Sequence, residues 1–373
     1  MRIPAHHRPS PASQPGAPRP RPAEAGIALI LVLGAIVVLT ALVAGFTYSM
    51  KVEARLAMNN RHEAEMEWMA RSGVELARFI LAQELLSPEG RMFDALNQKW
   101  AGGVGSPTNE ILAGISLTDN QIGRGRFALS ITDQERRFNI NSADQFVLSQ
   151  ALLMMNVDAS LHATIVDSIL DWRDPDDDPR LNGAESDDFY LRLDPPYFAK
   201  NGPIDDLSEL LLVRGITPEI YWGSGSTNVL RSQPVAAPGA LPRFDEEPYI
   251  VHGLRDLFTA VSAPQVNINT CSAETLQLAG LDPLVAQFVL EARRGPDGVD
   301  GTEDDMPFRS TAQIPVPGND PALRQQIQQY FTIRSRTFEV IVTCDIGGYV
   351  RQYRALLDRR SQRDIVVLFL HAL

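Results

Sequence analysis

An uninterrupted apolar run stands near the start of the chain. Residues 26–50, GIALILVLGAIVVLTALVAGFTYSM, contain no charged side chain. As an α-helix, this stretch would measure roughly 37 Å, which exceeds the ~30 Å hydrocarbon core of a bilayer. The pattern therefore predicts a membrane-spanning helix.

Beyond Lys51 the apolar positions become periodic instead of continuous. They recur mainly at spacings of three and four residues, which is typical of one face of an α-helix, and charged residues such as Glu67 and Arg71 occupy other positions. The SPEG segment at residues 87–90 is a stop signal. We expect one helix to about Leu86, whose second half packs on a globular head. The periodic positions are Val52, Leu56, Met66, Met69, Val74, Ala77, Ile80, Leu81 and Leu85.

Strand-like segments form two groups that lie far apart in the sequence. GRFALSITD and RRFNIN fall within residues 125–141, and the second group occupies residues 337–358 and 364–373. Gly347 and Gly348 mark a hairpin between β-rich runs. Helical patterns, acidic loops and a proline-rich connector at 232–248 lie between the groups. This order predicts an α+β head with a helical insertion.

The insertion contains an internal repeat. FNINSADQFVLSQAL at 138–152 corresponds to VNINTCSAETLQLAG at 266–280, and each copy continues into a second apolar helix, an acidic loop and a closing segment. The unit resembles helix-hairpin-helix modules. DNA-binding modules offer backbone amides of a glycine-rich hairpin to phosphate, whereas MNVDASLH has no glycine and AGLDPLV keeps only Gly280. With a net charge of −12, the chain is not expected to bind nucleic acid.

Acidic side chains are concentrated in the segment DWRDPDDDPRLNGAESDDFYLRLDPPY, residues 171–197. Carboxylates this dense repel one another unless a cation collects them. Aspartates alternate from Asp174 to Asp178, and Glu185 follows at the spacing of the last ligand in an EF-hand calcium loop. Pro179 stands where an EF-hand needs glycine, so the loop does not fold as a standard EF-hand, and a solvated acidic loop is the alternative. The predicted calcium ligands are Asp171, Asp174, Asp176, Asp178, Glu185 and Asp188.

A second acidic loop, GPDGVDGTEDDMPF at residues 295–308, is another calcium candidate. Its carboxylates are Asp297, Asp300, Glu303, Asp304 and Asp305.

Catalytic motifs are missing from the sequence. HEAEM at 62–66 has Met66 where a zincin motif needs its second histidine, and neither a nucleophile elbow nor a phosphate-binding Gly-Lys-Ser/Thr loop occurs. We therefore do not expect an enzyme.

Cys271 and Cys344 are the only cysteines. They would suit one disulfide in an oxidising exterior or two unpaired buried thiols. One follows the VNIN segment and the other ends TFEVIVTC. If these two segments are neighbours in the head, Cys271 and Cys344 can pair.

Several segments together resemble the type II secretion minor pseudopilin K family, also called general secretion pathway protein K. They are the junction of Gly26 with the apolar helix, RFNIN at 137–141, ILDWRDPDDDPRLNGAESDDFY at 169–190, LDPPY at 193–197 and LSELLLVRGITPEIY at 207–221. The resemblance covers nearly the whole chain.

The resemblance implies that prepilin peptidase cleaves after Gly26 on the cytoplasmic side, so that the mature chain begins at an N-methylated Ile27. It implies a pilin-like α+β fold, with a long N-terminal helix, an antiparallel sheet and a large helical insertion of helix-hairpin-helix or SAM-like type that holds calcium. The implied role is to initiate or cap the type II secretion pseudopilus, at its tip, together with minor pseudopilins I and J, for export of folded proteins.

The arginine-rich leader agrees with this orientation, because the positive-inside rule keeps it cytoplasmic and sends the head across the inner membrane into the periplasm. The expected segments are 1–26 leader, 27–50 membrane helix, 51–140 amphipathic half-helix and first strands, 141–265 inserted helical domain, 266–336 second module and 337–373 last strands.

Counting from Ile27, the fifth residue is Leu31, where pilins and most pseudopilins carry glutamate. That carboxylate is expected to neutralise the terminal ammonium of a neighbouring subunit within the apolar fibre core. A subunit with no neighbour above it needs no such carboxylate, so Leu31 favours a single capping copy.

Two other function classes remain open from the sequence. One is an extracytoplasmic, membrane-anchored DNA receptor that uses the paired hairpin modules. The other is a membrane-tethered enzyme whose acidic loops hold a catalytic metal.

Overall fold

The computed structural model describes residues 22–106, 109–223 and 252–373, with the side chains of the first helix described from Ala28 onward. Most of the leader and the connector at 232–248 lie outside the described residues. The chain divides into two compact units, Met1–Ala64 and Glu65–Leu373, and each is described here by itself.

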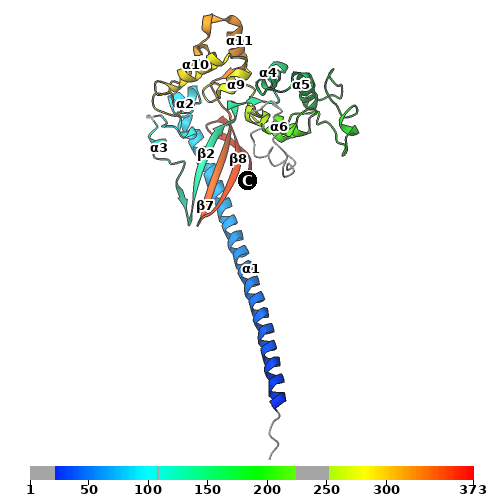
Figure 1. Ribbon diagram of the computed structural model, residues 1–373. Coiled ribbons are helices and arrows are strands. Elements are labelled where there is room, and N and C mark those ends of the chain that lie inside the picture. Colours follow the sequence, from blue (N-terminus) through cyan, green and yellow to red (C-terminus); the bar gives the residue numbers. More distant parts are fainter. Residues whose placement is uncertain (1–21, 107–108, 224–251) are drawn as a thin grey trace, which may run out of the picture. The chain divides into compact units, whose positions relative to one another are not determined.

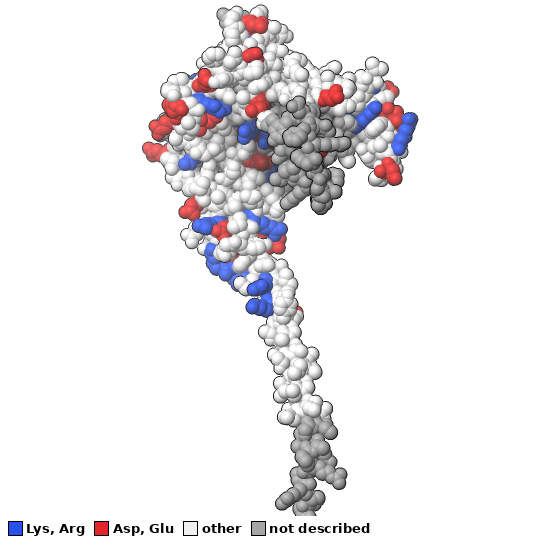
Figure 2. All heavy atoms as spheres, viewed as in Figure 1, with Lys and Arg blue, Asp and Glu red and all other residues white. Residues whose placement is uncertain are grey.

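The described part of the first unit is helical. It belongs to α1 (Pro22–Glu84), and the side chains from Ala28 to Arg61 are exposed. Figure 2 shows a largely uncharged surface along this stretch. Among the described residues, α1 is the one helix long and apolar enough to cross a membrane, which fits a single-pass anchor. Its end at Glu84 agrees with the predicted end near Leu86.

An antiparallel five-stranded sheet forms the head of the second unit (Figure 1), in the order β1-β2-β7-β8-β9. Strands from the two distant sequence groups pair directly, with Ile131 opposite Val340. The predicted hairpin is confirmed at Gly347 and Gly348, whose φ angles of 60° and 88° are readily adopted by glycine. The strands are β1 (Asn120–Ile122), β2 (Gly125–Asp133), β7 (Thr337–Ile346), β8 (Tyr349–Ser361) and β9 (Asp364–Ala372).

The second-unit part of α1 packs against this sheet. A Cβ added at Gly73 would lie 2.7 Å from Val342 Cγ1 and 3.0 Å from Leu129 Cδ2, so glycine permits the close approach of helix and sheet. The periodic residues predicted to face the head are buried here from Met66 to Leu81, whereas Val52 and Leu56 in the first unit are exposed. The core includes Met66, Met69, Ala70, Val74, Ala77, Ile80, Leu81, Phe127, Val340 and Cys344.

The helical insertion contains both copies of the repeat, and the structure confirms their equivalence. In the first copy, β3 (Phe138–Asn139) pairs in parallel with β4 (Phe258–Thr259); in the second, β5 (Val266–Asn267) pairs in parallel with β6 (Phe331–Thr332). The repeat helices are α4 (Gln145–Met154) and α5 (Ala159–Arg173) in the first copy, and α9 (Ala273–Leu278) and α10 (Pro283–Arg294) in the second.

The second asparagine of each Asn-x-Asn motif binds the closing segment of its own copy. Asn141 accepts the backbone N–H of Ile204 at 2.7 Å and donates to its carbonyl at 2.9 Å. Asn269 makes the same two bonds with Phe308, at 2.8 and 2.9 Å. The Pro-Ile segment therefore attaches the end of the first repeat copy to its Asn-x-Asn motif, and the Pro-Phe segment does the same in the second copy.

An arginine at the end of the second helix repeats this symmetry. Arg173 donates to the carbonyls of Ile140 and Ala143, and Arg293 donates to those of Ile268 and Cys271. Cys271 therefore occupies the position of Ala143 in the other copy, where a small apolar residue is required.

The two hairpins reach a left-handed backbone conformation through different residues. Gly280 has φ 86° in the second hairpin, and Asn156 has φ 54° in the first. Asparagine tolerates this conformation better than most residues, so the first hairpin turns without glycine.

The remaining helical elements connect these parts. They are α2 (Pro88–Met92), η1 (Lys99–Ala101), α3 (Glu110–Ala113), η2 (Gln134–Arg136), η3 (Tyr190–Arg192), η4 (Leu207–Leu212), α6 (Pro218–Trp222), α8 (Leu254–Leu257), η5 (Thr311–Gln313), η6 (Pro317–Asn319) and α11 (Pro321–Tyr330).

A buried polar junction joins the sheet to the second repeat copy. Asp133, at the end of β2, accepts the hydroxyls of Ser335 and Thr270, both at 2.6 Å. Glu135 accepts the backbone N–H of Thr337 at 3.0 Å. Burial, followed by the Glu135 carboxylate, raises the pKa of Asp133 well above its ordinary value.

The cysteines differ from the pairing proposed from the sequence: both are free and buried. Cys271 lies in the core of the repeats, where its thiol contacts the carbonyl of Ile268. Cys344 lies in the core between α1 and the sheet, where its thiol contacts the carbonyl of Met66. Each thiol is enclosed by a different core, and burial raises the pKa of both to about 11.

Candidate metal site

The acidic loop of the first repeat folds back over the end of α5. Asp158 caps the start of this helix by accepting the N–H of Ser160 at 2.9 Å. At the other end, Trp172 packs edge-on against Tyr190 at 5.3 Å, which fixes the far end of the loop to the helix. The carboxylates at the end of α5 and those of the loop are thereby brought together.

Asp171 is fully buried at the centre of this turn. Its carboxylate accepts the backbone N–H groups of Arg180 at 3.2 Å and Ala184 at 2.9 Å. A Cβ at Gly183 would lie 1.8 Å from Asp171 Oδ2, so no other residue fits this close approach. Burial raises the pKa of Asp171, and its bonds to Arg180 oppose that effect.

The Arg180 guanidinium bridges two carboxylates. Its Nη1 lies 2.6 Å from Asp171 Oδ1 and 2.5 Å from Asp174 Oδ2. Asp174 Oδ1 is buried without a hydrogen-bond partner. The Arg180 side chain therefore pairs with two aspartates, and the Oδ1 atom of Asp174 is left without a donor.

Glu185 is the clearest sign that a cation belongs here. It is 1% exposed, and neither carboxylate oxygen has a hydrogen-bond partner. Burial, followed by the charges of Asp171, Asp174 and Asp177, raises its pKa to about 7. A buried carboxylate with two unused oxygens beside other carboxylates suits a hard cation that prefers oxygen ligands, and the residues present therefore fit calcium.

The remaining predicted ligands make hydrogen bonds within the same loop. Asp188 accepts the N–H of Glu185 at 2.8 Å, and Asp176 accepts the N–H of Asp178 at 3.1 Å. Asp177 is not among the predicted ligands, yet its charge helps to raise the pKa of Glu185. Its carboxylate accepts a hydrogen bond from the Asn201 side chain at 2.6 Å. An EF-hand places its ligands at alternating positions, which leaves out Asp177. Pro179, at the position where an EF-hand needs glycine, already indicated that this spacing does not apply.

No three His, Cys, Asp or Glu side chains among the described residues are already arranged as a metal site. In the first loop, Arg180 holds Asp171 and Asp174 instead. Metal ligation there would require the Arg180 side chain to release one or both carboxylates.

The second acidic loop has a different electrostatic arrangement. Asp300 pairs with Arg293 at 3.1 Å and with Arg294 at 3.0 Å. Because Arg173 and Arg293 are equivalent, Arg294 stands where the first copy has Asp174. Asp304 accepts the N–H of Asp297 at 2.9 Å, and Asp305 accepts that of Gly301 at 2.8 Å. Asp300 is therefore paired with the two arginines at the end of α10, and Asp304 and Asp305 are paired with backbone N–H groups of the loop.

Comparison with known proteins finds similarity to components of secretion systems. Residues 125–222 match the family model described as Type II secretion system (T2SS), protein K. This segment contains β2, the first repeat copy and its acidic loop.

Curated relatives carry the same description. The putative type II secretion system protein K of Escherichia coli K12 is 27% identical over 209 residues, covering 52% of this chain and 59% of the relative. The type II secretion system protein K of Pseudomonas aeruginosa is 25% identical over 347 residues, covering 92% of this chain and 91% of the relative. The chain thus spans just over half of the first relative and nearly all of the second.

A solved structure shares the fold. It comes from the crystal structure of the GspK-GspI-GspJ complex of the enterotoxigenic Escherichia coli type 2 secretion system. The likeness has a TM-score of 0.61 at 17% identity and covers 85% of this chain and 99% of that chain. The predicted α+β fold, with its long N-terminal helix, antiparallel sheet and helical portion, is confirmed, and so is the resemblance: this chain is similar to protein K of type II secretion systems, whose family model matches residues 125–222.

Proposed function

We propose that this protein is a minor pseudopilin of a type II secretion system, which initiates or caps the pseudopilus through which folded proteins are exported across the outer membrane. The observation that carries the proposal is the family-matched segment at residues 125–222, built into a head whose fold resembles that of a GspK chain. The role is structural, and its partners are minor pseudopilins I and J.

The long apolar helix supports an inner-membrane anchor with the head in the periplasm. Prepilin peptidase would remove the leader after Gly26, and Ile27 would become the N-methylated first residue of the mature chain. Both positions fall within α1. Intact-mass measurement of the purified chain tests this, because cleavage after residue 45, or no cleavage in a host with active prepilin peptidase, contradicts the pilin-like assignment.

Calcium would be held in the first acidic loop by Glu185, Asp171, Asp174 and Asp177, with Asp176, Asp178 and Asp188 within the same loop. Bound there, the ion would supply positive charge that neutralises Glu185 and fixes the loop to the end of α5. The unpartnered oxygens of Glu185 support this assignment. Asp171 is held in the loop by its bonds to the backbone N–H groups of Arg180 and Ala184.

A gene deletion in the native host tests the secretion role. Without this chain, proteins normally exported by the type II system should accumulate in the periplasm, and expression of the full chain should restore their release. A strain with an inactive prepilin peptidase serves as the control for general loss of the system. Export at the wild-type rate in the deletion strain contradicts the proposal.

A further inference from the structure

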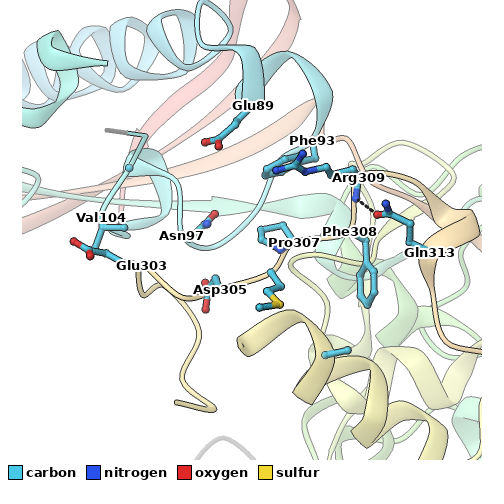
Figure 3. A pocket seen from close by; sticks show the side chains of 13 residues that line it. Glu89, Phe93, Asn97, Val104, Glu303, Asp305, Pro307, Phe308, Arg309 and Gln313 are labelled. Atoms are coloured by element: carbon cyan, nitrogen blue, oxygen red, sulfur yellow. Dashed lines mark hydrogen bonds between the residues drawn. The ribbon is translucent and has the colours of Figure 1, made fainter. Parts of the chain in front are cut away.

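A cleft of about 910 Å³ lies in the second unit, away from the first acidic loop (Figure 3). Its volume falls within the range of about 300–1,000 Å³ that ligand pockets occupy. One wall comes from α2 and the segment that follows it, including Phe93, Asn97 and Val104. The other wall comes from the second acidic loop, including Asp305 and Met306.

The walls of the cleft combine exposed apolar surface with acidic groups. Val104 is 50% exposed and Met306 is 61% exposed. The carboxylates of Glu89, Glu303 and Asp305 line the same cleft. In Figure 3 Arg309, the one basic residue in the lining, lies beside Gln313 on the side of the view opposite Glu303. Arg309 therefore lies apart from Glu303 in this view.

Asn97 adds an independent sign of a missing donor. Its Oδ1 atom is buried and has no hydrogen-bond partner. Such an acceptor is costly unless a donor reaches it. Burial also raises the pKa of Asp305, and the hydrogen bond that it accepts from the Gly301 N–H opposes that effect. Both observations are satisfied by a ligand that brings positive charge and N–H donors into an apolar setting.

We propose that this cleft docks a lysine or arginine side chain, flanked by apolar residues, from another protein. The aliphatic stem of such a side chain would cover Val104 and Met306, while its charged end would meet Asn97 and the carboxylates of Glu303 and Asp305. This assignment rests on charge complementarity and on the unused acceptor, and it does not depend on the proposed secretion role.

The test uses the full-length chain in detergent and a trifluoroacetyl-capped peptide amide, Gly-Leu-Lys-Leu-Gly, observed by fluorine NMR. A matched peptide carries norleucine in place of lysine and so keeps the apolar stem without the charge. The lysine peptide should bind saturably, and the norleucine peptide should bind at least about tenfold more weakly. Raising the salt concentration from about 0.05 to about 0.5 M should weaken only the lysine peptide.

Variants assign the binding to this cleft. The double variant Glu303→Gln, Asp305→Asn should lower affinity for the lysine peptide by about tenfold or more. The control Glu110→Gln, Asp364→Asn removes two exposed acids outside the lining and should bind as the parent does. Equal binding of both peptides, no binding of the lysine peptide, or unchanged binding by the double variant overturns the proposal. Displacement of the lysine peptide by Ca²⁺ at equimolar concentration also overturns it, because the cleft would then be a metal site.

Discussion

At the scale of single residues, Asp133 makes stability depend on pH. It lies beside Glu135, which accepts backbone N–H groups from Thr337 and Ala263. Burial, followed by the Glu135 carboxylate, raises the pKa of Asp133. The folded protein therefore retains a proton on Asp133 that the unfolded chain releases near its ordinary pKa of about 4.

The sign of the effect follows from this difference in bound protons. The stability that Asp133 contributes is fully present below the unfolded pKa and is lost as pH rises through the raised folded pKa. The variant Asp133→Asn, which imitates the protonated form, should therefore lose less stability than the parent as pH rises above the ordinary aspartate pKa. Urea unfolding at several pH values measures this, and identical pH slopes for both proteins would contradict the assignment.

Glu185 gives the residue-scale test of calcium. In the full chain, Ca²⁺ added after chelation should raise the thermal midpoint, because an ion that binds only the folded state stabilises it. Glu185→Gln should remove most of that increase, while Asp187→Asn, at an exposed position of the same loop, should keep it. No calcium-dependent change in the parent, or an unchanged response in Glu185→Gln, counts against the site.

The cysteines provide a simpler residue-scale prediction. Since Cys271 and Cys344 lie in different cores, purification without reductant should leave two free thiols. Denaturation in the presence of an alkylating reagent should add two labels per chain. A mass two protons lighter, with no labelling, would show a disulfide in place of the two free thiols.

At the scale of elements, the contact of α1 with the sheet depends on Gly73. The variant Gly73→Leu should destabilise the fold by about 1–3 kcal/mol, because even its Cβ would overlap Val342. Gly114→Leu is the matched control, since no atom lies within 4 Å of a Cβ there. Chemical unfolding compares the two. Equal stability of both variants would argue against this packing.

The elements that the sequence predicted are those with strong local patterns. The end of α1, the strands near 125–133 and 337–373 and the Gly347–Gly348 hairpin all follow from periodicity and turn residues. The repeat was also visible, because its Asn-x-Asn motifs recur with similar neighbours.

What the sequence could not reveal depends on contacts between distant residues. Arg359 donates to Asp94 at 2.6 Å across 265 positions, and no local pattern reports that pairing. The role of Asp177 and the bridge made by Arg180 depend on how the first loop folds over α5. The different surroundings of the two cysteines likewise follow from packing, not from the spacing of Cys271 and Cys344.

At the scale of the whole molecule, Leu31 bears on position within an assembly. If the chain is cleaved after Gly26 as proposed, Leu31 becomes its fifth residue, and a subunit placed below another would offer no carboxylate to the neighbouring terminal ammonium. Crosslinking from residues 52–86 should therefore capture other minor pseudopilins and not further copies of this chain. A ladder of homo-oligomers would contradict a single capping copy.

We propose that this chain assembles with minor pseudopilins I and J. To test this assembly, the three full-length chains would be co-expressed from one genome, purified in detergent through a tag on this chain and weighed by native mass spectrometry. We expect one complex that contains a single copy of this chain with one copy of each partner. Recovery of this chain alone or only as a homo-oligomer, from cells that contain all three folded chains, would show that the proposed assembly does not form.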